Sequence, residues 1–291
     1  MTLRQLGELG LIRRIRERVG GGGPSVQTGI GDDAAVLNLA PGAALLATTD
    51  LVIEDVHFRR AWASPRDIGW KAMAVNLSDI AAMGGAPRWA LVALALPDGT
   101  EPAEVDAFYE GMQEAAAPHG VVIVGGDTSA SRVGWVINVT VLGEHTGSPR
   151  LRSAAKPGDA VAVTGSLGRA AGGLAVLEMG RQRARGAGIA APEWETLTTA
   201  HLRPTARIDE GRWLGAAPGV HAMIDCSDGL STDLGHICRE SGVGARVMLD
   251  RLPVAAETRA AAAAAGADAL RWAVAGGEDY ELLLTCDPSV V

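Results

Sequence analysis

Aspartates cluster at five places in this chain, and most of them follow an apolar run and have small residues as neighbours. The clusters are GIGDDAAV (29–36), ATTD (47–50), NLSD (76–79), GGDT (125–128) and DCSDGLSTD (225–233). Carboxylates gathered at one place repel each other and do not all stay ionised unless cations bind between them. Carboxylate, hydroxyl and carbonyl oxygens suit Mg²⁺ or Mn²⁺ rather than Zn²⁺. The pattern therefore predicts a multi-metal site for a phosphate-rich substrate.

Asp79 is the most informative of these residues. It lies on the apolar face of a helix predicted at 66–83, in line with Ile68, Ala72, Val75 and Ala82. A carboxylate on a buried face needs a partner or a metal ion. A hydrogen bond to a neighbouring loop is the alternative, but a metal role is favoured.

The other clusters also permit ordinary structural interpretations. Asp32 and Asp33 fit a turn. Thr48, Thr49 and Asp50 fit the end of a strand, and Gly125-Gly126-Asp127-Thr128 fits a turn after one, although two glycines also allow close approach of an anion. Asp228 fits a helix N-cap, and that helix N-terminus also favours phosphate. Glu278 and Asp279 fit a turn or a site, and a lone His57 fits a surface or core position.

Helices and strands alternate along the chain. Helices are predicted at 2–19, 66–83, 102–117 (capped by Thr100), 168–180, 193–201, 206–215, 229–241 and 254–266. Strands are predicted at 34–38, 44–49, 89–96, 121–125, 135–144, 160–165, 221–226, 245–250 and 279–286. The polar, Pro/Gly-rich segment 145–159 is typical of a linker. We therefore predict an α/β or α+β protein with two domains, 1–145 and 146–291.

Composition excludes several function classes. The net charge of −8 argues against a nucleic-acid or anionic-membrane surface, although metal ions can still bring nucleotides to an acidic protein. No apolar run reaches the roughly 18 residues of a membrane span. Cys226, Cys238 and Cys286 contain no CxxC pair, which argues against disulfides or zinc and favours a reducing, cytoplasmic compartment. The absence of GxxxxGKS/T, HExxH and GxSxG sequences argues against P-loop kinases, zinc proteases and α/β-hydrolases.

Together the motifs resemble one family. Their order along nearly the whole chain is GIGDDAAV, TTDLVIEDVHF, KAMAVNLSDIAAMGGAP, GGDTS, RSAAKPGD, HLRPTAR, IDCSDGLSTDLGHI and GGEDYELL. This set is similar to the thiamine-monophosphate kinases, in the superfamily of aminoimidazole ribonucleotide synthetase. The resemblance implies an α+β fold of two domains, an N-terminal mixed sheet with helices that pairs in a homodimer and a C-terminal α/β domain. It also implies transfer of the ATP γ-phosphoryl group to thiamine monophosphate, the last step of thiamine diphosphate biosynthesis.

The resemblance also assigns site residues by position. Ligands for several Mg²⁺ ions fall on Asp33, Thr48, Thr49, Asp50, Asp79, Asp127, Asp225 and Asp228. ATP contacts fall on Tyr109, Gly126, Asp127, Arg152 and Ser227, and thiamine-phosphate contacts on His57 and Glu278. Asp55 stands where the family has glycine, so a different local turn is expected. The family's C-terminal aromatic contact to thiamine falls beyond residue 291, so we expect further sequence there and an incomplete acceptor pocket.

The expected mechanism needs no catalytic side chain. Donor and acceptor are both anions, so an acidic protein requires Mg²⁺ to hold them together. The acceptor oxygen is already deprotonated near neutral pH, which removes the need for a general base and favours direct in-line transfer without a phosphoenzyme. Two alternatives stay open: another ATP-using member of the superfamily, and a non-catalytic Mg-nucleotide-binding regulator. The first cysteine is Cys226, which argues against a selenophosphate synthetase with its N-terminal Cys or selenocysteine.

Overall fold

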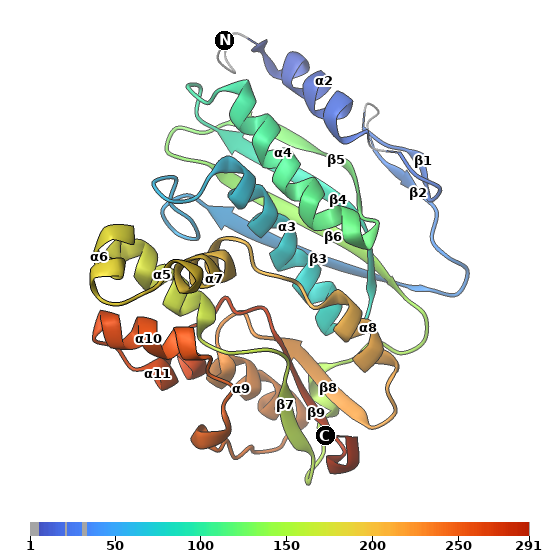
Figure 1. Cartoon of the computed structure of the whole chain (residues 1–291). Coiled ribbons are helices and arrows are strands. Elements are labelled where there is room, and N and C mark those ends of the chain that lie inside the picture. The colour runs from blue at the N-terminus through green and yellow to red at the C-terminus, as the bar shows by residue number, and fades with distance from the viewer. Residues whose placement is uncertain (1–5, 21, 31–33, 291) are drawn as a thin grey trace. The chain divides into compact units, whose positions relative to one another are not determined.

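Two units make up the chain, and the computed structural model describes residues 6–20, 22–30 and 34–290 of it. The first unit comprises residues 1–80 and 85–147, and the second comprises 81–84 and 148–291. Figure 1 shows the course of the chain through both. Each unit is described by itself.

The first unit contains three helices and six strands among its described residues. In chain order they are α2 (Glu8–Val19), β1 (Val26–Thr28), β2 (Val36–Leu37), β3 (Ala44–Ile53), α3 (Pro65–Ala82), β4 (Ala86–Leu96), α4 (Pro102–Ala116), β5 (Val122–Ala130) and β6 (Val136–His145), with a 3₁₀ turn at Ala117–His119. The last residues of α3, from Ala81, belong to the second unit.

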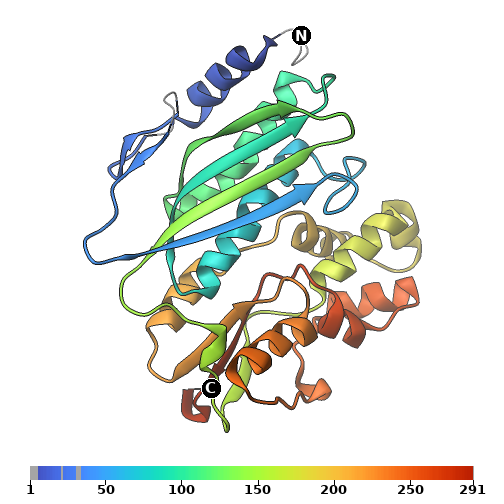
Figure 2. The same ribbon diagram turned by 180° about the vertical axis from the view of Figure 1, so that it is seen from behind.

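The main sheet of the first unit is mixed, as predicted. Its strand order is β3-β6-β4-β5. β4 and β5 run parallel, whereas β6 is antiparallel to both β3 and β4. Helices α3 and α4 cover one face, against which Ile137, Val139 and Val141 of β6 are fully buried (Figure 1). The other face is the one seen in Figure 2, and there Leu45 and Leu51 of β3 remain 50% and 53% exposed.

Helices α3 and α4 meet at backbone distance. A Cβ on Gly69 would lie 1.9 Å from the carbonyl oxygen of Phe108, and one on Gly111 would lie 1.8 Å from that of Arg66. This close packing buries α3 on nearly all sides, so its buried surface is wider than the predicted stripe. The predicted Thr100 cap of α4 is wrong. Glu101 and Glu104 form a capping box instead, and the buried Thr100 hydroxyl has no hydrogen-bond partner among the described residues.

The second unit is richer in helices. Its elements are β7 (Ala160–Val163), α5 (Arg169–Met179), α6 (Arg181–Gly186), α7 (Ala191–Leu202), α8 (Ile208–Ala216), β8 (Val220–Asp225), α9 (Leu230–Ser241), α10 (Ala256–Ala265), α11 (Ala269–Ala275) and β9 (Leu282–Cys286). Short 3₁₀ turns lie at Arg152–Ala154, Leu249–Arg251 and Pro288–Val290. The sheet has the order β7-β9-β8, and β9 is antiparallel to both neighbours.

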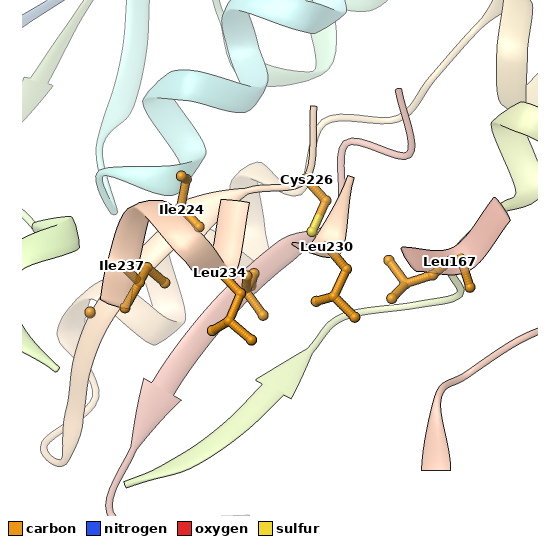
Figure 3. Close-up of a cluster of buried hydrophobic side chains, with 9 residues drawn as sticks. Leu167, Ile224, Cys226, Leu230, Leu234 and Ile237 are labelled. Atoms are coloured by element: carbon orange, nitrogen blue, oxygen red, sulfur yellow. The ribbon is translucent and has the colours of Figure 1, made fainter. Parts of the chain in front are cut away.

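An apolar core lies between this sheet and α9. Ile224 and Cys226 at the end of β8 pack with Leu230, Leu234 and Ile237 on one side of α9 (Figure 3). The 3–4 residue spacing of the three α9 residues places them on a single helical face. A second cluster, built by α5, α6, α7 and α10, contains Val176, Ala184, Ile189, Leu197 and Ala261.

Three predictions about strands need correction. The segment 245–250 is not a strand; Val247, Met248 and Leu249 there are 37–52% exposed, and a strand forms only where a neighbouring strand completes its hydrogen bonds. β3 and β5 do not end at the Thr/Asp and Gly/Asp clusters but continue through them to Ile53 and Ala130. These clusters are therefore held within a sheet rather than at turns.

Among the described helices, none combines the length and the apolar character needed to cross a membrane.

Candidate active site

Three predicted metal ligands, Thr48, Asp50 and Asp79, meet between β3 and α3. Thr48 and Asp50 pair in register with Val141 and Val139 of β6, which are fully buried on the helix-covered face. Asp79 reaches them from α3 and accepts a hydrogen bond from the Thr48 hydroxyl. Burial, followed by the negative charge of Asp79, raises the pKa of Asp50 from 3.8 to about 6. The two carboxylates therefore lie in a place that disfavours two negative charges without a cation.

This group of oxygens fits a hard divalent cation. Mg²⁺ is usually held by one or two carboxylates together with water and substrate phosphates. In the part of the chain that the structure describes, no group of three or more His, Cys, Asp or Glu side chains is placed to hold a metal. At a site built on Asp50 and Asp79, a hard divalent cation would have two carboxylate ligands and take its other ligands from hydroxyl, water or substrate oxygens. Asp33 lies outside the described residues.

Asp127 lies far from this pair. Leu51, Asn138, Ala93 and Asp127 are paired in one row across β3, β6, β4 and β5. Residues paired in a row share a face, so Asp127 lies on the face that carries Leu51, opposite to that of Asp50. Three strand spacings separate the two edge strands, which is about 14 Å. The structure therefore does not bring Asp127 to Asp50 within one chain.

Thr49 also faces away from the pair. Its hydroxyl is hydrogen-bonded to Asn138 and to Thr140 at 3.0 Å on the Leu51 face. Adjacent residues of a strand point to opposite faces, which separates Thr49 from Thr48 and Asp50. The side chain of Thr49 thus lies with Asp127 on the open side of the sheet.

Gly126 brings β5 close to β4. A Cβ there would lie 1.9 Å from the carbonyl oxygen of Val92, so no other residue fits without moving the strand. The pairing of β4 and β5 shifts register just before this point, between Ala90 and Leu91. The Asp127 carboxylate accepts a hydrogen bond from the backbone of Thr128 at 2.8 Å. These contacts fix the Gly126-Asp127 backbone at the edge of the sheet.

His57 follows β3 in a turn that determines its tautomer. The Ile53 N–H donates to His57 Nδ1 at 3.1 Å, so in the neutral ring the proton resides on Nε2. The buried Lys71 donates to the His57 carbonyl at 3.1 Å. His57 therefore presents an N–H donor, which suits contact with a phosphate oxygen.

The same turn contains Asp55, where the resembling family has glycine. Asp55 has φ 63°, in the left-handed region that glycine favours. Its N–H donates to the carbonyl of Phe58 at 2.8 Å, which closes the turn. Asp55 thus adopts a conformation that is open to glycine as well, at some steric cost, and whether the turn differs from that of the family stays a prediction.

Tyr109 is held in the interior of the first unit. It is 3% exposed and packs edge-on against Phe108, with ring centroids 5.4 Å apart. Burial raises the pKa of the Tyr109 phenol. The structure places this predicted ATP contact on α4, beneath the surface of the unit.

The second unit assembles its own group of predicted site residues. Asp225 ends β8, and Ser227 and Asp228 form the turn that leads into α9. The Asp228 N–H donates to Asp233 Oδ2 at 3.3 Å. Burial, followed by the charge of Asp228, raises the pKa of Asp233 to about 6, and the charge of Arg152 opposes this shift. Arg152, Asp228 and Asp233 are therefore near enough to influence one another at the start of α9.

A second segment, 276–281, lies along this turn. Glu278 and Tyr280 donate their N–H groups to the carbonyls of Ser227 at 2.8 Å and Cys226 at 2.9 Å. The Asp279 carboxylate accepts hydrogen bonds from Gly168 at 2.6 Å and Ala170 at 3.1 Å, at the N-terminus of α5. Burial is the main cause that raises the pKa of Asp279 to about 6. These hydrogen bonds hold the segment 276–281 and the turn after β8 together, and we call the two segments the loop frame.

Sequence reasoning missed three kinds of residue that hold the loop frame in place through side-chain contacts. Asp233 lies within the quoted DCSDGLSTD motif, and its place in the first turn of α9 was the available signal. Glu281 is 4% exposed and forms a two-pronged pair with Arg207, with both N···O distances 2.7 Å. His201 and Arg207 both lie in the HLRPTAR motif, whose residue types alone indicate no role for either.

Comparison with protein families gives two matches. Residues 31–145 match the family described as AIR synthase related protein, N-terminal domain, and residues 156–288 match AIR synthase related protein, C-terminal domain. Together they cover more than half of the chain.

Curated relatives are similar over nearly the whole chain. A thiamine-monophosphate kinase of Salmonella typhimurium is 41% identical over 286 residues, which cover 96% of this chain and 82% of the relative. That of Bacillus subtilis is 40% identical over 89% of this chain and 77% of its own length. The Aquifex aeolicus enzyme is 38% identical over 98% and 87%, respectively.

Solved structures show the same relationship. The thiamine-monophosphate kinase from Stenotrophomonas maltophilia superposes with a TM-score of 0.81 at 37% identity, covering 96% of this chain and 85% of the other. AaThiL complexed with AMPPCP and TMP superposes with a TM-score of 0.79 at 37% identity, covering 99% and 88%. The E. coli hydrogenase maturation protein HypE, at 23% identity and a TM-score of 0.77, shares the fold.

Proposed function

The chain belongs to the AIR synthase related protein family, and we propose that it phosphorylates thiamine monophosphate with ATP to give thiamine diphosphate and ADP. One observation carries this conclusion: nearly the whole chain is similar to thiamine-monophosphate kinases, including a structure that holds AMPPCP, an ATP analogue, together with TMP. The enzyme is thus a kinase whose acceptor is itself a phosphate.

Magnesium is the metal that the oxygen ligands suit best. We assign it to Asp33, Thr48, Thr49, Asp50, Asp79, Asp127, Asp225 and Asp228. The Asp50–Asp79 pair supports this assignment, because two close carboxylates with a neighbouring hydroxyl favour a cation. When bound, Mg²⁺ neutralises phosphate charge and aligns the reacting oxygens.

Protein groups bind and orient the two substrates. We assign ATP to Tyr109, Gly126, Asp127, Arg152 and Ser227, with the Arg152 guanidinium directed to the donor phosphates. His57 donates from Nε2 to the acceptor phosphate, and the Glu278 carboxylate faces the positively charged thiamine. No base is required because the acceptor oxygen is already ionised. Burial and nearby carboxylates raise the pKa of Cys226, which suits it poorly to nucleophilic attack.

We propose a homodimer formed through the open face of the first-unit sheet. Exposed Leu45 and Leu51 on that face give apolar surface for a second copy. Asp127 and Thr49 lie on the same face, away from Asp50 and Asp79. In a symmetric pair formed through this face, Asp127 and Thr49 would meet the same face of the second copy, apart from the Asp50–Asp79 group of their own chain. The division into an N-terminal nucleotide-binding, dimerising domain (1–145) and a C-terminal domain (146–291) belongs to this proposal.

A cytoplasmic location is also part of the proposal. The three cysteines are free thiols, which a reducing compartment suits. We expect no nucleic-acid and no membrane partner.

A coupled assay of ADP release tests the activity. With Mg²⁺ and ATP, ADP should form when thiamine monophosphate is present, and thiamine diphosphate should accumulate in equal amount. Thiamine without its phosphate is the matched control acceptor and should give no ADP above background. Chelation of Mg²⁺ should stop the reaction. ADP release that does not depend on thiamine monophosphate would refute the proposal.

A further inference from the structure

The Glu278 carboxylate is in contact with a buried histidine to which the family motifs give no role. We propose that His201 is a positioning residue, which fixes the Glu278 carboxylate in the orientation that binds thiamine monophosphate. The inference deepens the proposed function and rests on it, because that function places Glu278 against the acceptor.

The contact itself is direct. His201 Nδ1 lies 3.2 Å from Glu278 Oε2. The His201 side chain is 6% exposed and that of Glu278 is 28% exposed, so the histidine forms the buried side of the pair. To bond a carboxylate, Nδ1 must carry a proton. His201 therefore acts as a donor whose position is set by the interior of the second unit.

The backbone fixes the other end of the Glu278 side chain. Glu278 has φ 59° and Tyr280 has φ 51°, both in the left-handed region that non-glycine residues rarely adopt. Hydrogen bonds from these two residues to Ser227 and Cys226 hold the conformation. Strained backbone kept in place by its surroundings is a feature of functional sites. With its backbone held here and its carboxylate held by His201, Glu278 is fixed at both ends.

The motif HLRPTAR connects twice to the segment that contains Glu278. His201 meets Glu278, and six residues later Arg207 holds the buried Glu281 through two hydrogen bonds of 2.7 Å. Both pairs join one acidic residue of GGEDYELL to one basic or imidazole group of HLRPTAR. The HLRPTAR motif thus holds the segment 276–281 in place through two side-chain pairs.

Helix packing sets the depth of His201. It lies near the C-terminal end of α7, which packs against α5. A Cβ on Gly173 of α5 would lie 2.1 Å from the Leu197 carbonyl oxygen and 2.9 Å from His201 Cβ. Glycine at this position therefore lets α7 approach until His201 reaches Glu278.

Steady-state kinetics of His201 variants test the proposal. His201→Leu removes the donor and should raise the KM for thiamine monophosphate about 10-fold, the loss of roughly one hydrogen bond to a charged group. The KM for ATP should stay within about 2-fold. His201→Asn places an amide N–H close to the Nδ1 position and should restore most of the acceptor affinity. Gln182→Leu, an exposed change on the neighbouring helix α6, is the control and should alter neither KM.

A double-mutant cycle separates positioning from general support of the fold. In the Glu278→Gln background, His201→Leu should have little further effect on the KM for thiamine monophosphate. Equal effects in both backgrounds, or a parallel loss of ATP affinity, would overturn the proposal. If His201→Leu does not fold, His201→Gln, whose amide lies one bond further out, takes its place in the cycle. Failure of the proposed function would show differently, as a wild-type chain without any acceptor-dependent ADP release.

Discussion

Asp50 and Asp79 show how much of the site depends on the charge of single residues. They share the Thr48 neighbourhood between β3 and α3, and the pKa of Asp50 is raised to about 6 because the group is buried beside a second carboxylate. Such a pair opposes folding until a cation neutralises it. The proposed binding of Mg²⁺ and the stability of the metal-free protein therefore make opposite demands on these two carboxylates.

Asp79→Asn should lower turnover by at least about 100-fold while the protein stays folded. The amide oxygen can still accept the Thr48 hydrogen bond, but it binds Mg²⁺ poorly. Without metal, the variant should be more stable than the wild type, because the repulsion of Asp50 is gone. Asp67→Asn in the first turn of the same helix makes the same chemical change and should leave turnover intact. Kinetics and urea unfolding measure the two effects, and wild-type turnover in Asp79→Asn would disprove the metal role.

Asp55→Gly should stabilise the protein by up to about 1 kcal/mol, because glycine adopts φ 63° without the steric cost that a side chain brings. Part of the gain is offset by the greater freedom of glycine in the unfolded chain. Asp55→Val is the opposite control, since a β-branched residue tolerates this conformation poorly. The urea midpoints of wild type, Asp55→Gly and Asp55→Val give their order of stability. A Gly variant less stable than the wild type would show that the Asp55 side chain itself stabilises the turn.

At the scale of elements, helix ends are supported by side chains distant in sequence. The N-terminus of α5 is capped by Asp279, a residue more than 100 positions later in the chain. The C-terminus of α8 is held by Arg150, which donates to the carbonyls of Gly215 and Ala217, each at 3.0 Å. These caps connect the helices of the second unit to the segments that contain the candidate site.

Asp279→Asn should flatten the pH dependence of stability between about pH 4 and 6. The folded pKa of Asp279 is raised from 3.8 to about 6, so the folded state binds the proton more tightly than the unfolded state. Its contribution to stability is complete below about pH 4 and is lost as pH rises through 6, by about 1–3 kcal/mol. The asparagine variant cannot titrate and lacks this slope. The free energy of unfolding of both proteins, measured at several pH values, checks this. The same dependence on pH in wild type and Asp279→Asn would contradict the prediction.

At the scale of the whole molecule, the open face of the first-unit sheet is the surface through which we propose that two copies pair. Leu45 and Leu51 are half exposed there, and Asp127 and Thr49 occupy the same face. The proposed homodimer would bury this apolar surface and bring a second set of carboxylates to it. Oligomeric state and activity should therefore change together.

Leu45→Arg should shift the protein from dimer to monomer and lower activity with it. A charge on the face that packs against the second copy must either be buried or separate the two. Val161→Arg, at a 39% exposed strand position of the second unit, is the matched control and should leave both properties unchanged. Light scattering after gel filtration gives the mass. If the Leu45→Arg protein remained dimeric, the interface would have to lie on another face, and the proposal would be wrong.

Local sequence patterns were sufficient to predict most helices and strands, but not which elements pack or pair with one another. The helix propensity of Ala predicted α10, and apolar periodicity predicted α3, α4 and α9, which bury residues that recur every three to four positions. It failed at 245–250, where alternation of residue types has no neighbouring strand to pair with. The Glu101 cap was missed because Thr100 is the more common capping type.

The candidate site shows the same limit. Period-two alternation alone separates Thr49 from Thr48 and Asp50 once the strand is known to continue to Ile53. No local signal joins His201 to Glu278 or Arg207 to Glu281, because each pair spans more than 70 residues and is brought together only by packing. Side-chain partners distant in sequence therefore require the structure.

The turn after β8 and the segment 276–281 are joined by three main-chain hydrogen bonds: Glu278 to Ser227, Tyr280 to Cys226, and Cys226 to Glu281. Main-chain bonds do not depend on which side chain a residue carries. Ser227 can thus be replaced with the same loop geometry, and Glu278 by residues that tolerate its left-handed conformation, such as Gly, Asn or Asp. Because the main-chain bonds hold the loop, these two positions are the first to randomise when a new acceptor is sought.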